Sequence, residues 1–144
     1  MLGRIAAEIS RHLTDDNLIA PAFRTFSDDS YARHLVYADP LGRFSVLVLA
    51  WLPGQITPIH GHNAWGVVGI HEGTMLNTCF RAAGSAEPIP TGSQRACAGS
   101  VVAVGAGDEG AHRLENPGPE AALTVHVYGM NLADNPTGIN RYYQ

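Results

Sequence analysis

The sequence predicts an all-β domain, a sandwich or barrel, that follows a short helical segment. Only 15% of the 144 residues are charged, and 16 glycines and 9 prolines mark frequent turns. About eight short apolar segments also follow one another at regular spacing, as in sandwiches and barrels. The length fits a single domain over residues 1–144, with the helical segment in 1–22 and the β-barrel in 31–128.

The N-terminal segment has the spacing of an amphipathic helix. Apolar residues recur every three or four positions between residues 2 and 13, which places them on one stripe of a helix surface. The polar run at 14–17 ends this helix. We expect one further helical turn through Ala20, just before Pro21.

The rest of the chain is predicted to form strands separated by turns. Residues 82–92 are rich in Ala, Gly, Ser and Pro and predict a surface loop. Residues 116–119 (Asn-Pro-Gly-Pro) predict a tight turn, and an irregular tail is expected from residue 131 onward. The predicted strands are residues 31–37, 44–52, 56–62, 65–71, 74–81, 101–104, 112–115 and 122–128.

Charge and hydropathy argue against nucleic acid and membranes as partners. The net charge is −4 and the basic residues are scattered, so no basic patch is expected for phosphates. The longest apolar run, residues 46–52, is far shorter than the roughly twenty residues that span a bilayer. Residues 1–11 carry Arg and Glu where a signal peptide needs apolar residues. With two cysteines, we expect a reduced, cytoplasmic setting.

Two histidines separated by one glycine, His60 and His62, are the strongest candidates for metal ligands. Side chains two positions apart on a strand point to the same face, so both imidazoles aim at one point. A pair of this kind also occurs on ordinary polar surfaces. The surrounding sequence therefore has to indicate whether this pair binds a metal.

The context is a pattern of glycines and a third histidine further along the chain. A glycine-rich turn at 105–107 is followed by His112 and Asn116. Together with His60 and His62, this order resembles the two-part signature of the cupin superfamily. The resemblance implies a double-stranded β-helix barrel, or jelly roll.

One departure from that signature changes the expected ligand set. Gly66 stands where the signature has a glutamate, four residues after His62, so His112 would complete a site of three histidines. Three neutral imidazoles leave a divalent metal its full charge and open positions. Such a metal favours an anionic ligand such as a thiolate, with dioxygen at another position.

Four segments in order resemble the cysteine dioxygenase family of thiol dioxygenases. The segments are residues 31–36 (YARHLV), 51–66 (WLPGQITPIHGHNAWG), 112–116 (HRLEN) and 124–128 (TVHVY). Members of this family are iron cupins that add both atoms of dioxygen to a thiol sulfur. The resemblance implies Fe(II) held by His60, His62 and His112, a small-molecule thiol and O2 as substrates, and a sulfinate product.

The same resemblance implies roles for five more residues. Thr124, His126 and Tyr128 alternate on one strand face, and would form a relay that orients the Tyr128 oxygen near dioxygen or substrate. Tyr31 and Arg33 share another face and would bind the thiol substrate, with its carboxylate on Arg33. Arginine at this position favours L-cysteine, whereas members with glutamine favour 3-mercaptopropionate.

Another departure concerns a covalent cross-link. Animal members of the family carry a cysteine that bonds to the active-site tyrosine, and Gly66 occupies that position here. Cys79 and Cys97 lie in no matching segment, so we expect two free thiols. Three other histidines are expected outside the site: His12, His34 and His71.

Alternative functions stay open at the level of the sequence. The substrate could be 3-mercaptopropionate or another thiol. A metal-binding cupin of different activity, an isomerase, a carbon dioxygenase or a small-molecule sensor, is the other alternative. The Tyr31/Arg33 and Thr124/His126/Tyr128 segments argue against the isomerase and the carbon dioxygenase. The low net charge argues against a DNA-binding regulator, whereas a sensor that acts through a partner stays open. The oligomeric state is left open.

Overall fold

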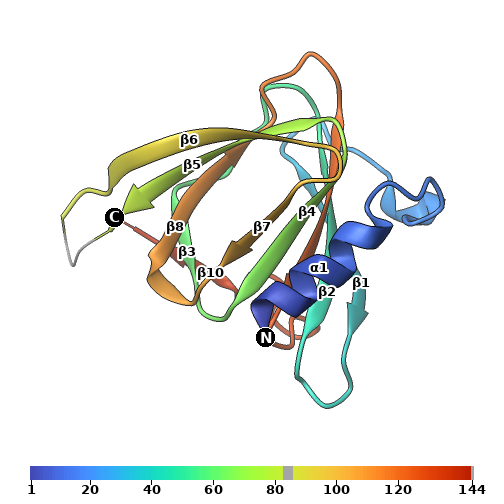
Figure 1. The fold of residues 1–144 in the computed structure, drawn as a ribbon, viewed down its shortest axis with the longest axis horizontal. Coiled ribbons are helices and arrows are strands. Elements are labelled where there is room, and N and C mark those ends of the chain that lie inside the picture. Colours follow the sequence, from blue (N-terminus) through green and yellow to red (C-terminus); the bar gives the residue numbers. More distant parts are fainter. Residues whose placement is uncertain (83–85, 144) are drawn as a thin grey trace.

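The computed structural model describes residues 1–82 and 86–143, which form two facing antiparallel sheets with one α-helix outside (Figure 1). The elements are α1 (Leu2–His12), the 3-10 turn η1 (Pro21–Phe23), β1 (Ala32–Ala38), β2 (Ser45–Trp51), β3 (His60–His62), β4 (Gly66–Glu72), β5 (Thr74–Arg81), β6 (Ile89–Cys97), β7 (Val101–Val104), β8 (Gly107–Glu115), β9 (Ala122–Tyr128) and β10 (Asn140–Tyr142). The first sheet has the order β1-β2-β9-β4-β7, and the second has the order β10-β3-β8-β5-β6. The predicted all-β jelly roll with an N-terminal helical segment is confirmed.

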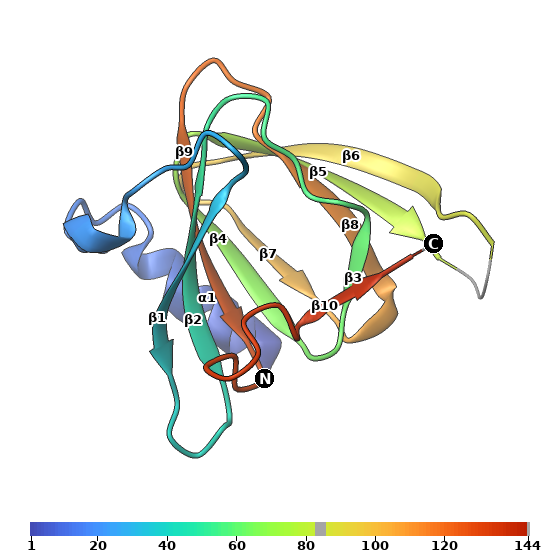
Figure 2. The same ribbon diagram turned by 180° about the vertical axis from the view of Figure 1, so that it is seen from behind.

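Two apolar clusters hold these layers together. One fills the space between the sheets and includes Leu47, Trp51, Ile70 and Leu114. The other joins the outer face of the first sheet to the N-terminal segment, where Leu13 is fully buried. Figure 2 shows α1 lying across the strands of the first sheet, on the side away from the barrel interior. The apolar stripe predicted for residues 2–13 therefore packs on the barrel.

Two glycines make these arrangements possible. Gly73 closes the β4–β5 hairpin with φ +80°, a backbone conformation that residues with a side chain rarely adopt. A Cβ at Gly69 would lie 2.6 Å from a methyl carbon of Leu13, so only glycine lets the end of the helix approach β4 this closely.

Several predicted element boundaries were wrong. Residues 89–92 of the predicted loop belong to strand β6, while 83–85 lie outside the described residues. This strand is almost entirely exposed at the sheet edge, so it lacks the apolar alternation that marks a strand. The helical turn expected through Ala20 instead begins at Pro21, whose fixed φ suits the first position of a helical turn.

Three further corrections affect the second sheet. The predicted irregular tail contains β10, which pairs with β3. Strand β8 begins at Gly107, five positions before the predicted start at His112, because residues 107–111 carry polar and small side chains that gave no strand signal. Conversely, β3 is shorter than the predicted 56–62 strand, since Pro58 cannot donate a ladder hydrogen bond.

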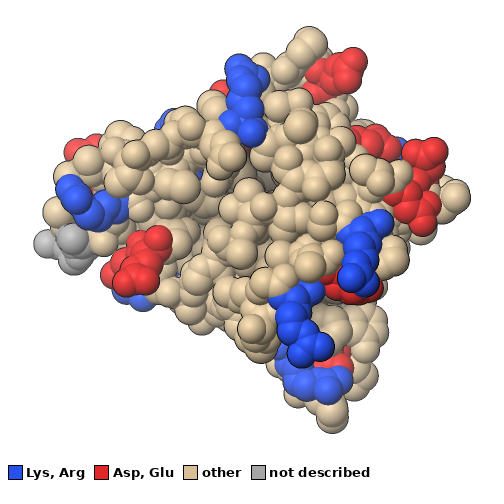
Figure 3. All heavy atoms as spheres, viewed as in Figure 1, with Lys and Arg blue, Asp and Glu red and all other residues tan. Residues whose placement is uncertain are grey.

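Charges are dispersed over the surface. On the face drawn in Figure 3, basic and acidic side chains occur in separate small groups around a mostly uncharged centre. Among the residues that the structure describes, no helix is both long and apolar enough to cross a membrane.

Candidate metal centre

Three buried histidines converge inside the second sheet. His60 and His62 lie on β3, and His112 lies directly opposite His60 on the neighbouring strand β8. One ring nitrogen from each lies within 4.8 Å of the others. The alternation of side chains along β3 brings its two imidazoles to one face, as the sequence predicted.

Hydrogen bonds fix which nitrogen faces the centre. His60 donates its Nδ1–H to the carbonyl oxygen of Pro58 at 2.9 Å. His112 donates its Nδ1–H to Oδ1 of the buried Asn77 at 2.8 Å. Since a carbonyl or amide oxygen only accepts, both rings carry their proton on Nδ1 and present an unprotonated Nε2. Such partners are the usual way in which proteins orient a histidine ligand.

Three ring nitrogens of His62 and His112 lack hydrogen-bond partners in the described part of the chain, and they allow a test of whether a metal ion fits this site. Among the described residues, neither nitrogen of His62, nor Nε2 of His112, has a hydrogen-bond partner, although all three atoms are buried. Buried polar atoms without partners are costly, and coordination of a metal ion would satisfy Nε2 of His112 and one of the two nitrogens of His62. Burial lowers the pKa of His60 and of His112, and it lowers the pKa of His62 to about 3. The three rings are therefore neutral ligands with free lone pairs, which fits a divalent metal.

A buried chain of hydrogen bonds runs along β9 beside this centre. Thr124 Oγ1 lies 2.7 Å from His126 Nε2, and His126 Nδ1 lies 2.9 Å from the Tyr128 hydroxyl. At its far end, Trp51 donates its indole N–H to Thr124 Oγ1 at 2.9 Å. Burial lowers the pKa of His126 and raises that of Tyr128, so both side chains are uncharged.

Tyr128 lies between this chain and the histidines. Its ring stacks on His62, with 5.9 Å between the ring centroids. On its other side it covers Gly66 of β4, where a Cβ would lie 2.7 Å from two of its ring carbons. The absence of a side chain at Gly66 gives the tyrosine ring its room.

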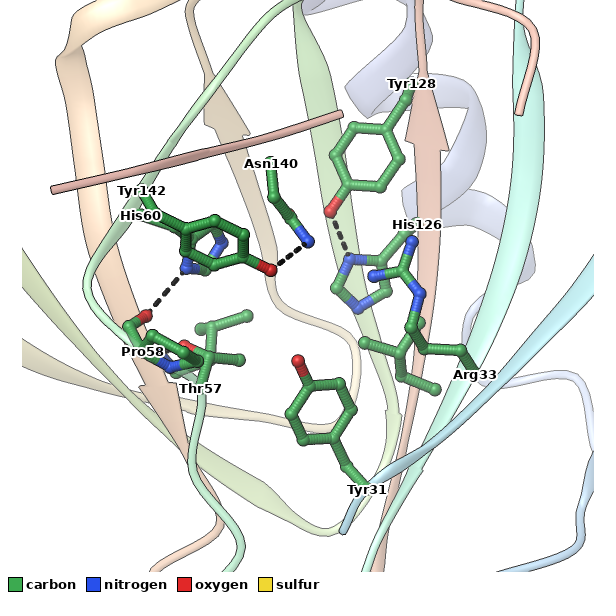
Figure 4. A pocket seen from close by; sticks show the side chains of 11 residues that line it. Tyr31, Arg33, Thr57, Pro58, His60, His126, Tyr128, Asn140 and Tyr142 are labelled. Atoms are coloured by element: carbon green, nitrogen blue, oxygen red, sulfur yellow. Dashed lines mark hydrogen bonds between the residues drawn. The ribbon is translucent and has the colours of Figure 1, made fainter. Parts of the chain in front are cut away.

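A pocket opens beside the three histidines (Figure 4). Tyr31 and Arg33 form one wall, and Tyr31 stacks on Trp51 with 4.5 Å between ring centroids. Arg33 donates from Nη2 to the carbonyl oxygen of Pro136, whereas its buried Nε has no partner in the described part of the chain. None of the described residues that line the pocket is an aspartate or glutamate. The pocket therefore offers hydrogen-bond donors and one positive charge to whatever it binds.

Comparison with known proteins places the chain in a family. A sequence profile of cysteine dioxygenase type I matches residues 7–142. The chain belongs to the cysteine dioxygenase type I family.

Solved structures similar to this family member share its fold. An uncharacterized conserved protein with a double-stranded β-helix domain from Klebsiella pneumoniae has a TM-score of 0.65 and 18% identity, over 91% of this chain and 95% of that one. The TT1209 protein of Thermus thermophilus has a TM-score of 0.58 and 20% identity, over 76% and 91% of the two chains. A cupin 2 conserved barrel domain protein from Salinispora arenicola has a TM-score of 0.55 and 17% identity, over 79% and 87%.

All eight site residues predicted from the sequence lie around the three histidines and the pocket beside them. Tyr31, Arg33, His60, His126 and Tyr128 line the pocket directly. The other three are buried behind them: His62, His112 and Thr124.

The other three histidines lie away from the metal centre. His71 is buried, but its Nδ1 donates to the carbonyl of Leu13 at the end of the helix. His34 contacts Thr25, and His12 is exposed beside Glu8. Cys79 and Cys97 are free thiols, as predicted, and both are exposed. Cys79 lies opposite His112 on the neighbouring strand, with its Sγ 3.7 Å from Asn77 Nδ2.

Sequence reasoning missed four residues that complete this region. Asn77 forms a hydrogen bond with His112, and Trp51 forms one with Thr124. An asparagine in the middle of a predicted strand was the signal that could have revealed Asn77. Asn140 and Tyr142 reach the pocket from β10, a strand that the sequence did not reveal.

Proposed function

We propose that this protein is a non-haem Fe(II) thiol dioxygenase that converts a small carboxylate-bearing thiol, with L-cysteine favoured, to its sulfinate. One observation carries the proposal: three neutral histidines converge beside a pocket that His60 lines, and the opposite wall of that pocket holds the guanidinium of Arg33. Membership of the cysteine dioxygenase type I family supports the same reaction class.

The reaction balances without another reductant. A thiolate R–S⁻ and O2 give R–SO2⁻: two S–O bonds form, the O–O bond breaks, and sulfur supplies the four electrons that dioxygen takes. A bound ferrous ion would supply coordination of the thiolate and activation of dioxygen.

The protein's own residues would hold the substrate and one proton. Arg33 carries a planar, permanently charged fork that matches a carboxylate, and its buried Nε is free to donate. Tyr31 brings a hydroxyl to the same wall, where burial raises its pKa and keeps it protonated. Tyr128 would place its hydroxyl, positioned by His126, next to the reacting sulfur and oxygen atoms.

One observation supports 3-mercaptopropionate as a second candidate substrate. No described carboxylate lines the pocket, so nothing there pairs with the ammonium group of cysteine. L-Cysteine would bind with its amine deprotonated, as a second ligand to the metal beside its thiolate. 3-Mercaptopropionate presents the same thiol and carboxylate without that requirement.

The test is oxygen uptake by the Fe(II)-loaded protein with L-cysteine, 3-mercaptopropionate and cysteamine, combined with mass analysis of the product. We expect one of the two carboxylate thiols to be consumed with O2 in equal amounts and to gain the mass of one dioxygen. Cysteamine, which lacks the carboxylate, should be the poorest of the three. No thiol-dependent uptake, or only disulfide as product, would show that the proposed reaction is wrong.

A further inference from the structure

The C-terminal strand β10 places two polar side chains in the pocket. It pairs with β3 so that Asn140 lies opposite His62 and Tyr142 lies opposite His60. Directly opposed residues of antiparallel strands point to the same face, so Asn140 and Tyr142 face the pocket with the histidines. Arg141, between them, points away and pairs with Asp108 at 3.3 Å.

A hydrogen bond sets the direction of the Tyr142 hydroxyl. Asn140 donates from Nδ2 to the Tyr142 oxygen at 3.0 Å. An amide NH2 group cannot accept in return, so the phenolic hydrogen of Tyr142 has to point elsewhere. In the described part of the chain that hydroxyl contacts no other acceptor. Figure 4 shows the hydroxyls of Tyr31, Tyr128 and Tyr142 directed into the same space.

The same C-terminal segment holds the positive charge of the pocket. The carbonyl oxygen of Pro136 accepts a hydrogen bond from Arg33 Nη2 at 2.6 Å. This contact spans the pocket from β1 to the segment that leads into β10. The position of Arg33 and the position of Tyr142 therefore depend on one stretch of chain.

We propose that Tyr142 is a further substrate-contacting residue, whose hydroxyl donates a hydrogen bond to the carboxylate of the substrate together with Arg33 and Tyr31. The inference rests on the proposed function, because it assumes a thiol whose sulfur faces the histidines. An anionic group suits a pocket that offers three donors, one of them charged, with no acidic residue among the described residues that line it. Tyr142 thereby contributes to selection between thiols with and without a carboxylate.

The chain supplies a matched control. Tyr143, the next residue, donates its hydroxyl to Asp108 at 3.0 Å and does not line the pocket. Tyr142→Phe and Tyr143→Phe each delete one phenolic oxygen from the same stretch of chain. Only the first removes a donor from the pocket.

The experiment compares both variants with the wild type, all loaded with Fe(II). Binding of L-cysteine, 3-mercaptopropionate and cysteamine is measured by anaerobic calorimetry, and KM and kcat by oxygen uptake. We expect Tyr142→Phe to raise Kd and KM for the carboxylate thiol by about tenfold, the contribution of one hydrogen bond to a charged group. Its kcat and its Kd for cysteamine should stay unchanged, and Tyr143→Phe should behave as wild type.

Two failures can be told apart. If the wild type oxidises none of the three thiols, the proposed function is wrong. If the wild type is active and Tyr142→Phe binds the carboxylate thiol as tightly as wild type, or weakens cysteamine equally, the assignment of Tyr142 is wrong.

Discussion

Trp51 donates its indole N–H to the hydroxyl oxygen of Thr124, with 2.9 Å between nitrogen and oxygen. An indole N–H can only donate, so Thr124 accepts from Trp51 and has its own hydrogen to donate. Its remaining partner in the described structure is His126 Nε2 at 2.7 Å. Thr124 therefore donates to Nε2, and His126 carries its proton on Nδ1 and donates it to the Tyr128 oxygen. The hydrogen of Tyr128 is left to point toward the pocket.

The first prediction removes the group that sets this direction. Trp51→Phe keeps an aromatic ring against Tyr31 but deletes the N–H. Thr124 can then reverse its role, and His126 should populate both tautomers. We expect kcat to fall by about tenfold with iron content unchanged. The nitrogen chemical shifts of His126 in the diamagnetic zinc-substituted protein should show a single tautomer in the wild type only. A wild-type tautomer in the variant would rule out this role for Trp51.

The sequence predicted the barrel and the residues around its centre because both leave a local signal. His60 and His62 alternate on one strand, and Thr124, His126 and Tyr128 alternate on another, so strand geometry alone groups each set. That the two sets meet depends on β3 and β9 lying in facing sheets. The order of matched segments indicated this through family resemblance, not through spacing.

What the sequence did not reveal depends on long-range pairing. Asn77 meets His112 only because β5 and β8 are neighbours in the second sheet. The short strand β10 exists only as a partner of β3 and has no apolar alternation of its own. Both the Asn77–His112 contact and strand β10 therefore depend on contacts between segments that are far apart in the chain.

The second prediction concerns the third histidine. His112→Ala should remove most of the bound iron, because two ligands on β3 cannot hold the ion tightly. Metal analysis after desalting measures the iron-to-protein ratio. His12→Ala, which changes an exposed histidine beside Glu8, is the control and should keep full iron. Full iron occupancy in His112→Ala would exclude His112 as a ligand.

The third prediction concerns the side chain that orients that histidine. Asn77→Leu leaves the Nδ1–H of His112 buried without an acceptor. We expect the affinity for Fe(II) to fall by about 10- to 100-fold, the usual effect of losing such a partner. Competition with a chelator measures it. Thr78→Val is the control, because Thr78 contacts Ser93, away from the histidines. Equal affinities in Asn77→Leu and wild type would mean that the hydrogen bond does not support the site.

The fourth prediction concerns stability in acid. Two hydrogen bonds from the Arg43 side chain, at 2.7 and 2.8 Å, hold the pKa of the buried Asp39 at about 2, below its ordinary 3.8. A lowered carboxyl pKa stabilises the fold fully above the ordinary pKa, and this stabilisation is lost as the pH falls toward the folded value.

Asp39→Asn should therefore unfold more easily than wild type at neutral pH, and the gap should close between about pH 4 and pH 2. Urea unfolding at a series of pH values measures the difference, with Asp28→Asn, at an exposed position, as the control. A gap that stays constant down to pH 2 would contradict an ionised Asp39 as its source.

The last prediction concerns the space that Gly66 leaves for Tyr128. A methyl group at Gly66 would lie 2.7 Å from two ring carbons of Tyr128 and 3.0 Å from Val104, so the tyrosine ring has to move. Movement would lengthen the 2.9 Å contact between its hydroxyl and His126. We expect Gly66→Ala to keep its iron and lose at least about tenfold in kcat, since small misplacements of a reacting group are costly. Gly92→Ala is the control, because a Cβ there meets nothing within 4 Å. Wild-type kcat in Gly66→Ala would show that turnover does not depend on where the Tyr128 hydroxyl lies.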